Sequence, residues 1–482
     1  MSAEGSGARP AGDDLPPEST PEAFSFSFSY RPVKEQREDE DEPRIRKVSV
    51  PVEVRGLPCR GTTGAVAPVL IFSSGFLTPA AAYGTLLQHL AAAGCVVVSY
   101  DKSFETLSYL MDDNDSVRLL EEVWRRAAEL LADRQAVWGG PAVGLAFLVG
   151  HSRGAKVSVL AAAAAAAAPA SGAEAYAAAT AGRGGPAGSD ADDVGAAGGE
   201  PASRRAWPSG QSAAVAAAPA PSASPAPTTT TQAAAAAAAA VAAASAAAAS
   251  PGPSLLLPLA GLVLLDPADG AFEPQDPDRY PSALAALAAT PPRAGVTAAA
   301  AGTAAAAVAG GGGGGAAAGG VGKEEAAAPL LPALVVGAGR GGDCVPRAKN
   351  FRVFYEAWPG PRALVTLPDA GHLQFLDASD RLTQSICATG RGVANAQVAG
   401  AAAAATAAFV RGVVAAAAAP GGAGADASRA AGAASGQGEV GRAGGSGGEG
   451  AGGLAAAALR GWCEGALEGA TPLKFSVVAA AP

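Results

Sequence analysis

The segment Val143-Gly-Leu-Ala-Phe-Leu-Val-Gly-His-Ser-Arg-Gly154 runs from an apolar stretch directly into a serine flanked by glycines. Its first seven residues lack the polar alternation of a half-exposed strand, which predicts a strand buried on both faces. From Ala155 onward the sequence has helical character. The segment therefore predicts a buried strand, a tight turn and a helix, with Ser152 in the turn.

The turn Gly150-His-Ser-Arg-Gly154 has the form Gly-x-Ser-x-Gly, which between a strand and a helix makes a nucleophile elbow. Glycine at both flanking positions lets the sharp turn close without a Cβ clash. The N-terminus of the following helix favours the negative charge that develops during attack. The motif alone is weak in a chain so rich in Gly, Ser and Ala, but the strand and the helix supply the required context. We therefore predict Ser152 as a nucleophile.

Other apolar runs predict the rest of the fold. Buried strands are predicted over 67–73, 95–100, 259–265, 331–337 and 363–367, separated by helical patterns over 83–93, 116–134, 347–358 and 401–417. This alternation predicts a mostly parallel central sheet with helices on both faces. Polar–apolar alternation predicts an antiparallel edge strand over 47–54 and a short strand over 25–30 that pairs with an edge. Together with the elbow, the pattern predicts an α/β-hydrolase fold.

Long stretches of Ala, Gly, Pro, Ser and Thr interrupt this pattern. They contain few large side chains, so they cannot bury enough apolar area to offset the chain entropy of ordering. We predict a disordered acidic tail over 1–45 and a single domain over 46–478. Disordered low-complexity insertions are predicted within the domain at about 161–252, 283–328 and 415–455.

The base that activates a serine is usually a histidine, and this chain has only three. His89 falls within a predicted helix, and His151 belongs to the elbow and should point away from the serine, so both are expected to be structural. His372 follows the last predicted strand, in the order serine, acid, histidine that the fold uses. It is the predicted general base.

The acid that orients the histidine has two candidates, each of which follows a strand. Asp266 ends the strand 259–265, and Asp343 lies in the loop after the next strand. Asp269 could instead be a turn residue, and Asp377 is too close to His372 in sequence to be a first choice. Asp266 and Asp343 both stay open at this point.

Two backbone N–H groups should stabilise the oxyanion. One belongs to Arg153, which follows the nucleophile, and the other is expected from Phe76 in the loop Ser74-Gly-Phe76 after the first buried strand. Gly75 permits a close backbone turn there. Leu77 and Phe272 are expected to line an apolar substrate site.

The formal net charge of −9 argues against nucleic acid as a partner, because no basic stripe is present to neutralise phosphates. The Ala-rich run 233–249 has no Leu, Ile or Phe to drive membrane insertion. The N-terminus has neither a secretory signal nor a clear transit peptide, so an intracellular protein is expected. No metal spacing or cofactor motif is present, and no cofactor is predicted.

The five cysteines form no CxxC pattern, and their odd number leaves at least one thiol free or paired with another chain. Free thiols are the expectation for an intracellular protein. A disulfide between Cys344 and Cys387, which flank the segment around His372, is the alternative.

Taken together, the motifs resemble those of the chlorophyllase family. The resemblance covers most of residues 46–415 outside the insertions, and Asp-Pro-x-Asp-Gly with Gly-His-Leu-x-x-Leu-Asp is more specific than the elbow alone. The matching stretches are Pro68-Val-Leu-Ile-Phe72 with Ser74-Gly-Phe76, Tyr83-Gly-Thr-Leu-Leu-Gln-His-Leu-Ala-Ala-Ala-Gly-Cys-Val-Val-Val98, Gly150-His-Ser-Arg-Gly-Ala-Lys156, Leu265-Asp-Pro-Ala-Asp-Gly270, Cys344-Val-Pro346, Gly371-His-Leu-Gln-Phe-Leu-Asp377 and Ser385-Ile-Cys-Ala-Thr-Gly390.

This resemblance implies hydrolysis of the phytyl ester of chlorophyll to chlorophyllide and phytol. It also implies a chloroplast location and peripheral contact with the thylakoid membrane or with pigment–protein complexes. A general carboxylesterase or lipase for another hydrophobic ester is the alternative, and a non-catalytic protein that binds pigment or lipid is a third hypothesis. The sequence does not indicate an oligomeric state.

The resemblance favours Asp266 as the acid, although the chain departs from the family pattern at three places. Ser74 stands where the family usually has His, Ala155 replaces a second Gly after the elbow, and Asp343 has no equivalent in the plant pattern. Asp343 therefore remains the second candidate.

Overall fold

The computed structural model describes residues 22–32, 47–57, 67–102, 105, 110–138, 143–167, 257–270, 276–293, 330–340, 344–378, 387, 389–390, 392–418 and 456–481. The predicted disorder of the segments between these ranges, and the positions of Phe272 and Asp343, lie outside the described residues.

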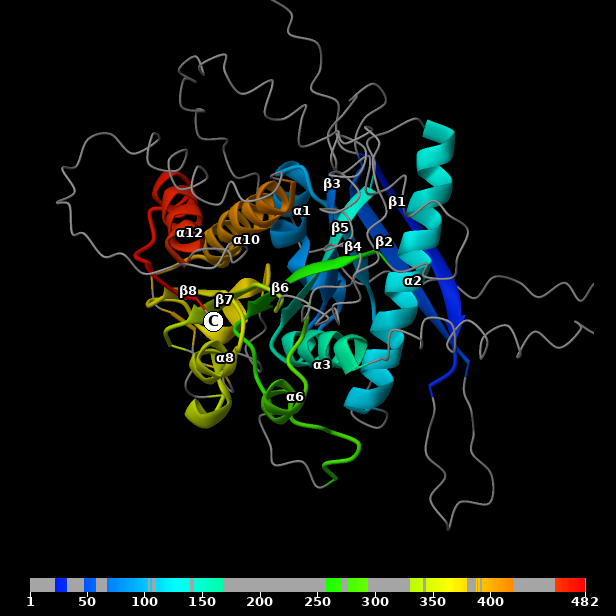
Figure 1. The fold of residues 1–482 in the computed structure, drawn as a ribbon, viewed down its shortest axis with the longest axis horizontal. Helices are drawn as coiled ribbons and strands as arrows, with labels where there is room; N and C mark the ends of the chain where they lie inside the picture. Colours follow the sequence, from blue (N-terminus) through cyan, green and yellow to red (C-terminus); the bar gives the residue numbers. More distant parts are fainter. Residues whose placement is uncertain are drawn as a thin grey trace, which may run out of the picture.

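One nine-stranded sheet forms the centre of the molecule, in the order β1-β2-β4-β3-β5-β6-β7-β8-β9 (Figure 1). The six strands from β4 to β8 in this order are mutually parallel, while β1, β2 and β9 run antiparallel to their neighbours. The strands are β1 Glu22–Tyr30, β2 Val48–Leu57, β3 Ala67–Ser73, β4 Val96–Tyr100, β5 Val143–His151, β6 Leu259–Leu265, β7 Ala333–Ala338, β8 Arg362–Leu367 and β9 Ser476–Ala480.

Helices cover both faces of the sheet and produce two apolar cores. The side chains of α1, α10 and α12 pack in one core, and those of α2, α3, α6 and α8 pack in the other (Figure 1). The helices are η1 Ala80–Tyr83, α1 Gly84–Ala92, α2 Asp113–Trp138, α3 Arg153–Ala167, α6 Ala283–Ala289, η4 Arg347–Lys349, α8 Phe351–Ala357, η5 His372–Phe375, α10 Asn395–Ala418 and α12 Ala456–Ala470. Every described residue of β4, β6 and β7 is buried, as continuous apolar runs predict.

The N-terminal region differs from the prediction of a disordered tail. Residues 22–30 form β1, which pairs with β2 over Phe28↔Val50 and neighbouring positions, so the predicted short strand over 25–30 is confirmed and is itself the edge of the sheet. The prediction of an edge position for 47–54 is wrong, because β1 covers one side of β2 and β4 pairs with the other. The aromatic side chains of β1 supply the apolar area that orders it.

The predicted bounds of the insertions are wrong at several ends. Helix α3 continues to Ala167, and α10 continues to Ala418, beyond the insertion starts predicted at 161 and 415. Residues 283–289 form α6, in which Ala283 and Leu287 are buried. Alanine is the strongest helix former and its small side chain allows close packing, so alanine-rich sequence next to the core forms helix rather than linker.

The insertion after α6 begins and ends at adjacent points. Arg293 and Leu330 form an antiparallel bridge, and the Leu331 N–H donates to the Pro292 carbonyl at 3.1 Å. The chain therefore leaves and re-enters the described fold at the same place.

Three further elements differ from the sequence prediction. The helix predicted over 347–358 is divided into η4 and α8, because Asn350 is extended and caps α8 through its side chain. Helix α12 and strand β9 have no predicted counterpart. Leu459, Cys463 and Leu467 recur every four residues on the buried face of α12.

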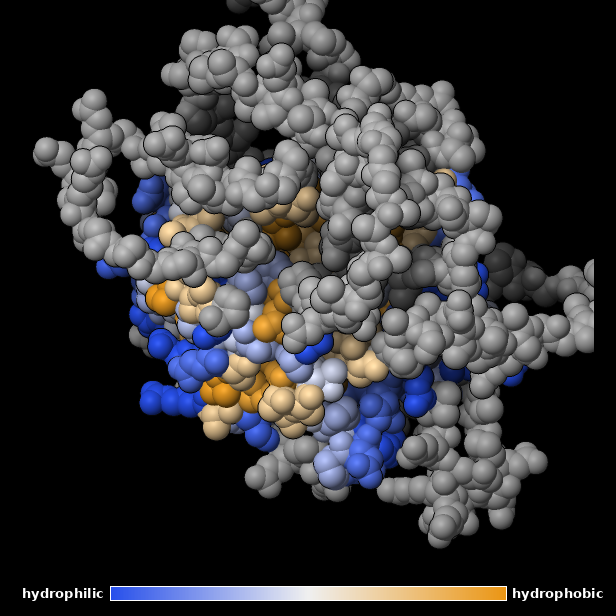
Figure 2. Space-filling model, viewed as in Figure 1, coloured by the Kyte–Doolittle hydropathy of each residue, from blue (hydrophilic) through white to orange (hydrophobic). Residues whose placement is uncertain are grey.

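Helix α10 is mostly apolar and packs in one of the two cores. By length and composition it could cross a membrane, but 67% of its apolar window is buried inside the protein, as in the core helix of a soluble protein. On the face drawn in Figure 2, apolar residues gather over α6 and α8 among hydrophilic ones. Helix α6 consists only of Ala and Leu, which accounts for part of this surface.

Candidate active site

The turn between β5 and α3 holds Ser152 in a left-handed conformation, with φ of 53°. A Cβ at Gly150 would lie 2.4 Å from Gly154 backbone atoms, and one at Gly154 would lie 2.1 Å from the Ser73 carbonyl oxygen. Only glycine fits at either position. The Ser152 N–H donates to the carbonyl of Leu265 at 3.0 Å, which ties the turn to the end of β6.

His372 begins η5, after β8 ends and the chain turns back toward Ser152. Its Nε2 lies 3.0 Å from Ser152 Oγ, and its ring is buried. Gln374 anchors this turn, because its Oε1 accepts the N–H groups of Gly371 and Gly390, each at 2.7 Å. Nε2 is thus held within hydrogen-bond distance of the serine hydroxyl, as a general base must be.

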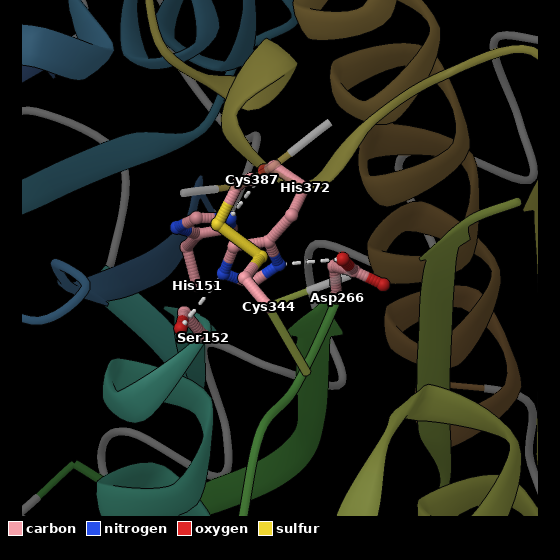
Figure 3. The surroundings of a disulfide bond; sticks show 6 residues. All are labelled: His151, Ser152, Asp266, Cys344, His372 and Cys387. Carbon is pink, nitrogen blue, oxygen red and sulfur yellow. Dashed lines mark hydrogen bonds and ion pairs between the residues drawn. A yellow bond between two sulfur atoms is a disulfide. The ribbon is translucent and has the colours of Figure 1, made fainter. Parts of the chain in front are cut away.

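Asp266 follows β6 and also has a positive φ, of 40°. Its Oδ2 lies 2.6 Å from His372 Nδ1, and its Oδ1 accepts the Ala338 N–H at 3.0 Å (Figure 3). The carboxylate holds a proton on Nδ1 and so leaves Nε2 free to face Ser152. Of the two acid candidates, Asp266 contacts the histidine, and Asp343 lies outside the described residues.

The two residues expected to supply oxyanion donors lie at the start of α3 and in the turn after β3. Arg153 is the first residue of α3, so its N–H has no acceptor within the helix. Phe76 lies in the turn after β3, next to Leu77, whose φ is 50°. The Arg153 guanidinium lies 6.0 Å from the centre of the Phe76 ring, so the two side chains are in contact range for a cation–π interaction.

His151, expected to be a packing residue, makes two hydrogen bonds. Its Nδ1 lies 2.8 Å from the Tyr83 hydroxyl, and its Nε2 lies 3.1 Å from the carbonyl oxygen of His372. The Tyr83 hydroxyl in turn accepts the Gly75 N–H at 3.0 Å. Burial, together with the nearby His372, lowers the pKa of His151 well below its usual value, so the ring is neutral.

Beneath the elbow, buried charges join α3 to α2. Asp113, in the first turn of α2, accepts from Arg153 Nε and from Lys156 Nζ, each at 2.8 Å. Glu105 contacts another nitrogen of Arg153 at 3.4 Å. Lys102 lies beside the same charges, and burial lowers its pKa to about 8. These contacts fix the start of α3 and hence the Arg153 backbone.

The other acidic residues weighed from the sequence make structural contacts, whereas the remaining histidine lies on the surface. Asp269 accepts from the Ala283 N–H at 2.7 Å and from the Ser282 hydroxyl at 2.5 Å at the start of α6. Asp377 accepts from the Thr85 N–H at 3.0 Å, at the start of α1. His89 is exposed on α1.

Of the two alternatives for Cys344 and Cys387, the structure has the disulfide (Figure 3). It joins the loop after β7 to the segment after η5, and the 43-residue interval that it closes includes His372. Cross-linking an interval of this length removes about 4 kcal/mol of unfolded-chain entropy. Cys95 and Cys463 are buried free thiols.

Among the described residues, no group of three or more His, Cys, Asp or Glu side chains could hold a metal ion.

Solved structures similar to this chain include esterases and lipases. Brefeldin A esterase, a bacterial homologue of human hormone-sensitive lipase, is 17% identical with a TM-score of 0.21, over 32% of this chain and 38% of that chain. Dienelactone hydrolase from Anabaena variabilis is 12% identical with a TM-score of 0.30, over 80% and 96%. A lipase/esterase from Lactobacillus plantarum is 9% identical with a TM-score of 0.31, over 69% and 84%. The chain thus spans about two fifths of the length of brefeldin A esterase.

The sequence matches no protein-family model and no curated protein. The architecture is nevertheless defined by the strand order, the parallel crossovers and the left-handed serine between β5 and α3. The chain has an α/β-hydrolase fold. In this fold, ligands bind beyond the carboxyl ends of the strands, where Ser152, Asp266 and His372 meet.

Tyr83 is the site residue that sequence reasoning missed. It lies at the end of η1, is fully buried, and its ring packs edge-on against Phe72. An aromatic residue at a helix start has no pattern that distinguishes a hydrogen-bonding partner from a core residue.

Proposed function

We propose that this protein is a serine ester hydrolase of the chlorophyllase type, which cleaves the phytyl ester of chlorophyll to chlorophyllide and phytol. The observation that carries the ester hydrolase proposal is the hydrogen-bonded series Ser152 Oγ, His372 Nε2, His372 Nδ1 and Asp266 Oδ2. The choice of chlorophyll rests on the motif resemblance alone.

The reaction takes two steps that share one geometry. His372 Nε2 accepts the Ser152 hydroxyl proton while Oγ attacks the ester carbonyl carbon, and the oxyanion faces the N–H groups of Arg153 and Phe76. The ester bond then breaks, and His372 returns the proton to the phytol oxygen. Water, deprotonated by His372, then attacks the acyl carbon; the bond to Ser152 Oγ breaks, His372 returns the proton to Oγ, and the chlorophyllide acid leaves and ionises. The proposal implies an intracellular, chloroplast location and access to the thylakoid membrane or pigment–protein complexes, where the substrate resides.

The test compares chlorophyll hydrolysis by the full-length protein and by Ser152→Ala. We expect phytol and chlorophyllide from the wild type, and a loss of at least about 10³-fold in the variant. Short p-nitrophenyl esters form the second arm, since the same three side chains would serve a general carboxylesterase or lipase. Turnover of the short esters alone would establish that alternative.

Labelling with a fluorophosphonate separates catalysis from binding. An activated serine reacts with this probe, so Ser152 should be modified in the folded wild type and the Ser152→Ala variant should stay unlabelled. Folded wild type that binds pigment but resists the probe would instead be a non-catalytic pigment or lipid carrier.

A further inference from the structure

The side chain of His151 lies between two parts of the candidate active site. On one side its Nε2 contacts the carbonyl oxygen of His372, and on the other its Nδ1 contacts the Tyr83 hydroxyl. Tyr83 continues the series to the backbone N–H of Gly75, in the loop that carries Phe76. His151 is 2% exposed and Tyr83 is fully buried, so solvent does not compete for these contacts.

The two ends of this series determine where each proton lies. The His372 carbonyl can only accept, so His151 Nε2 must carry a proton. A neutral imidazole carries one proton, which makes Nδ1 an acceptor and the Tyr83 hydroxyl its donor. The Tyr83 oxygen then uses a lone pair to accept the Gly75 N–H. All four polar groups are satisfied by this single arrangement.

The ring of His151 must stay neutral for the same site to work. It lies 4.8 Å from the His372 ring, centre to centre, and 5.3 Å from the Phe375 ring. The titratable groups that it contacts are Tyr83 and His372, and neither offers a negative charge at neutral pH. A cation on His151 would oppose the imidazolium that forms on His372 during attack.

Gly75 packs closely against this series, and a side chain there would be crowded. A Cβ there would lie 3.1 Å from the Tyr83 hydroxyl, 3.2 Å from His151 Nδ1 and 3.5 Å from the Ser152 Cβ. The loop backbone therefore packs directly on the hydrogen-bonded pair, and a shift of either side chain moves the loop.

We propose that His151 and Tyr83 are positioning residues. Together they fix the position of the His372 backbone relative to the loop that carries Gly75 and Phe76. The inference rests on the proposed function, because it assigns roles relative to the general base and the Phe76 N–H. A positioning role differs from a packing role in two ways. It requires the Nε2–H tautomer of His151, and it requires that changes of Tyr83 and His151 have the same, non-additive effect.

Kinetics of Tyr83→Phe, His151→Phe and the double variant test the shared effect. Each single variant should lower kcat by about 10-fold to 10²-fold with KM within about twofold, since misplacement of reacting groups affects the chemical step. The double variant should lose no more than the worse single variant, because each change interrupts the same series. His151→Gln should recover most of kcat, because Gln Nε2 can donate to His372 and Oε1 can accept from Tyr83.

Tyr100→Phe is the matched control. Its hydroxyl is also fully buried and forms a 2.9 Å hydrogen bond with the Ser73 hydroxyl, outside the series. We expect it to lower thermal stability as Tyr83→Phe does while leaving kcat unchanged. Equal kcat in the two Phe variants, or multiplicative losses in the double variant, would overturn the proposal.

Histidine-selective ¹⁵N NMR gives a readout that does not depend on turnover. The chain has three histidines, and His89→Gln and Ser152→Ala spectra assist their assignment. His151 should show the Nε2–H tautomer and should not titrate between pH 6 and 9. An Nδ1–H tautomer or an ordinary titration would refute the assignment. If Ser152→Ala keeps full activity, the proposed function fails instead, independently of the tautomer.

Discussion

Leu77, Ser152 and Asp266 are the non-glycine residues of the described chain that have positive φ, and each follows a strand at the candidate active site. Such conformations cost about 1–2 kcal/mol for a residue with a side chain. Asp tolerates them better than most residues, and hydrogen bonds of the neighbouring backbone can hold such a residue in place. The Ser152 N–H to Leu265 and Asp266 N–H to Val336 hydrogen bonds supply that support between neighbouring strands. Backbone strain of this kind is common at active sites, where it orients a functional side chain.

The acid is tested by comparing Asp266→Asn with Asp343→Asn. We expect kcat of Asp266→Asn to fall by about 10⁴, because an amide facing His372 Nδ1 favours the wrong tautomer. Asp343→Asn should keep kcat within about twofold. The measurement is kcat for steady-state hydrolysis of the best ester substrate. If both variants stay active, the assignment of an aspartate as the acid behind His372 is refuted.

The pH dependence of stability reports the neutral state of His151. Its pKa is lowered by burial in the folded protein, so below about pH 6.5 the unfolded chain binds a proton that the folded chain does not. The free energy of unfolding should therefore fall with decreasing pH, by up to about 1.4 kcal/mol per pH unit from this one group. Denaturant unfolding from pH 8 to 5 should show that the deficit of His151→Gln relative to wild type shrinks on acidification. His89→Gln is the control variant. If the free energies of unfolding of His151→Gln and wild type change in parallel with pH, the prediction is contradicted.

At the scale of elements, α2 and α3 depend on a buried group of charges. Asp113 is 2% exposed and accepts from Arg153 and Lys156, so Asp113→Asn leaves two buried cations undercompensated. We expect a loss of about 3 kcal/mol in the free energy of unfolding, measured in urea. Arg460→Met, which breaks an exposed pair with Glu464 on α12, should cost under about 1 kcal/mol. Equal losses would show that the Asp113 contacts contribute no more than a surface pair.

The buried strands and the fold class could be predicted from the sequence, because continuous apolar runs between helical patterns have few other interpretations. Helix α6 could not be separated from the insertion after it, since both are rich in Ala and only packing against α3 and α8 distinguishes the helix. Ser152 and His372 were the predicted pair, but Asp266 and Asp343 each follow a strand. The choice between them depends on which loop reaches Nδ1, and pairing of β6 with its neighbours sets that distance.

At the scale of the whole molecule, the first two alanine-rich insertions join the described fold away from the candidate site. Helix α3 starts at the carboxyl end of β5 and the chain re-enters at the amino end of β6, and the Arg293–Leu330 bridge likewise precedes β7. Ser152, Asp266 and His372 lie beyond the opposite, carboxyl ends.

Replacing residues 295–328 with Asn-Gly should therefore leave kcat within about twofold and the unfolding midpoint within a few degrees. A short turn can connect the bridged residues Arg293 and Leu330, and shortening a loop lowers its closure entropy. Ester hydrolysis and thermal unfolding of the shortened protein provide the measurement. A large rise in KM would instead show that this insertion takes part in substrate binding.

The same bridge divides the proposed catalytic groups between two pieces of chain. Ser152 and Asp266 precede Arg293, whereas His372 follows Leu330, and the pairing of β6 with β7 is the seam between the pieces. Neither piece alone can deprotonate the serine. The proposed ester hydrolysis would therefore need both pieces, and in a protein cut between Arg293 and Leu330 it would report their reassembly, as in a split enzyme.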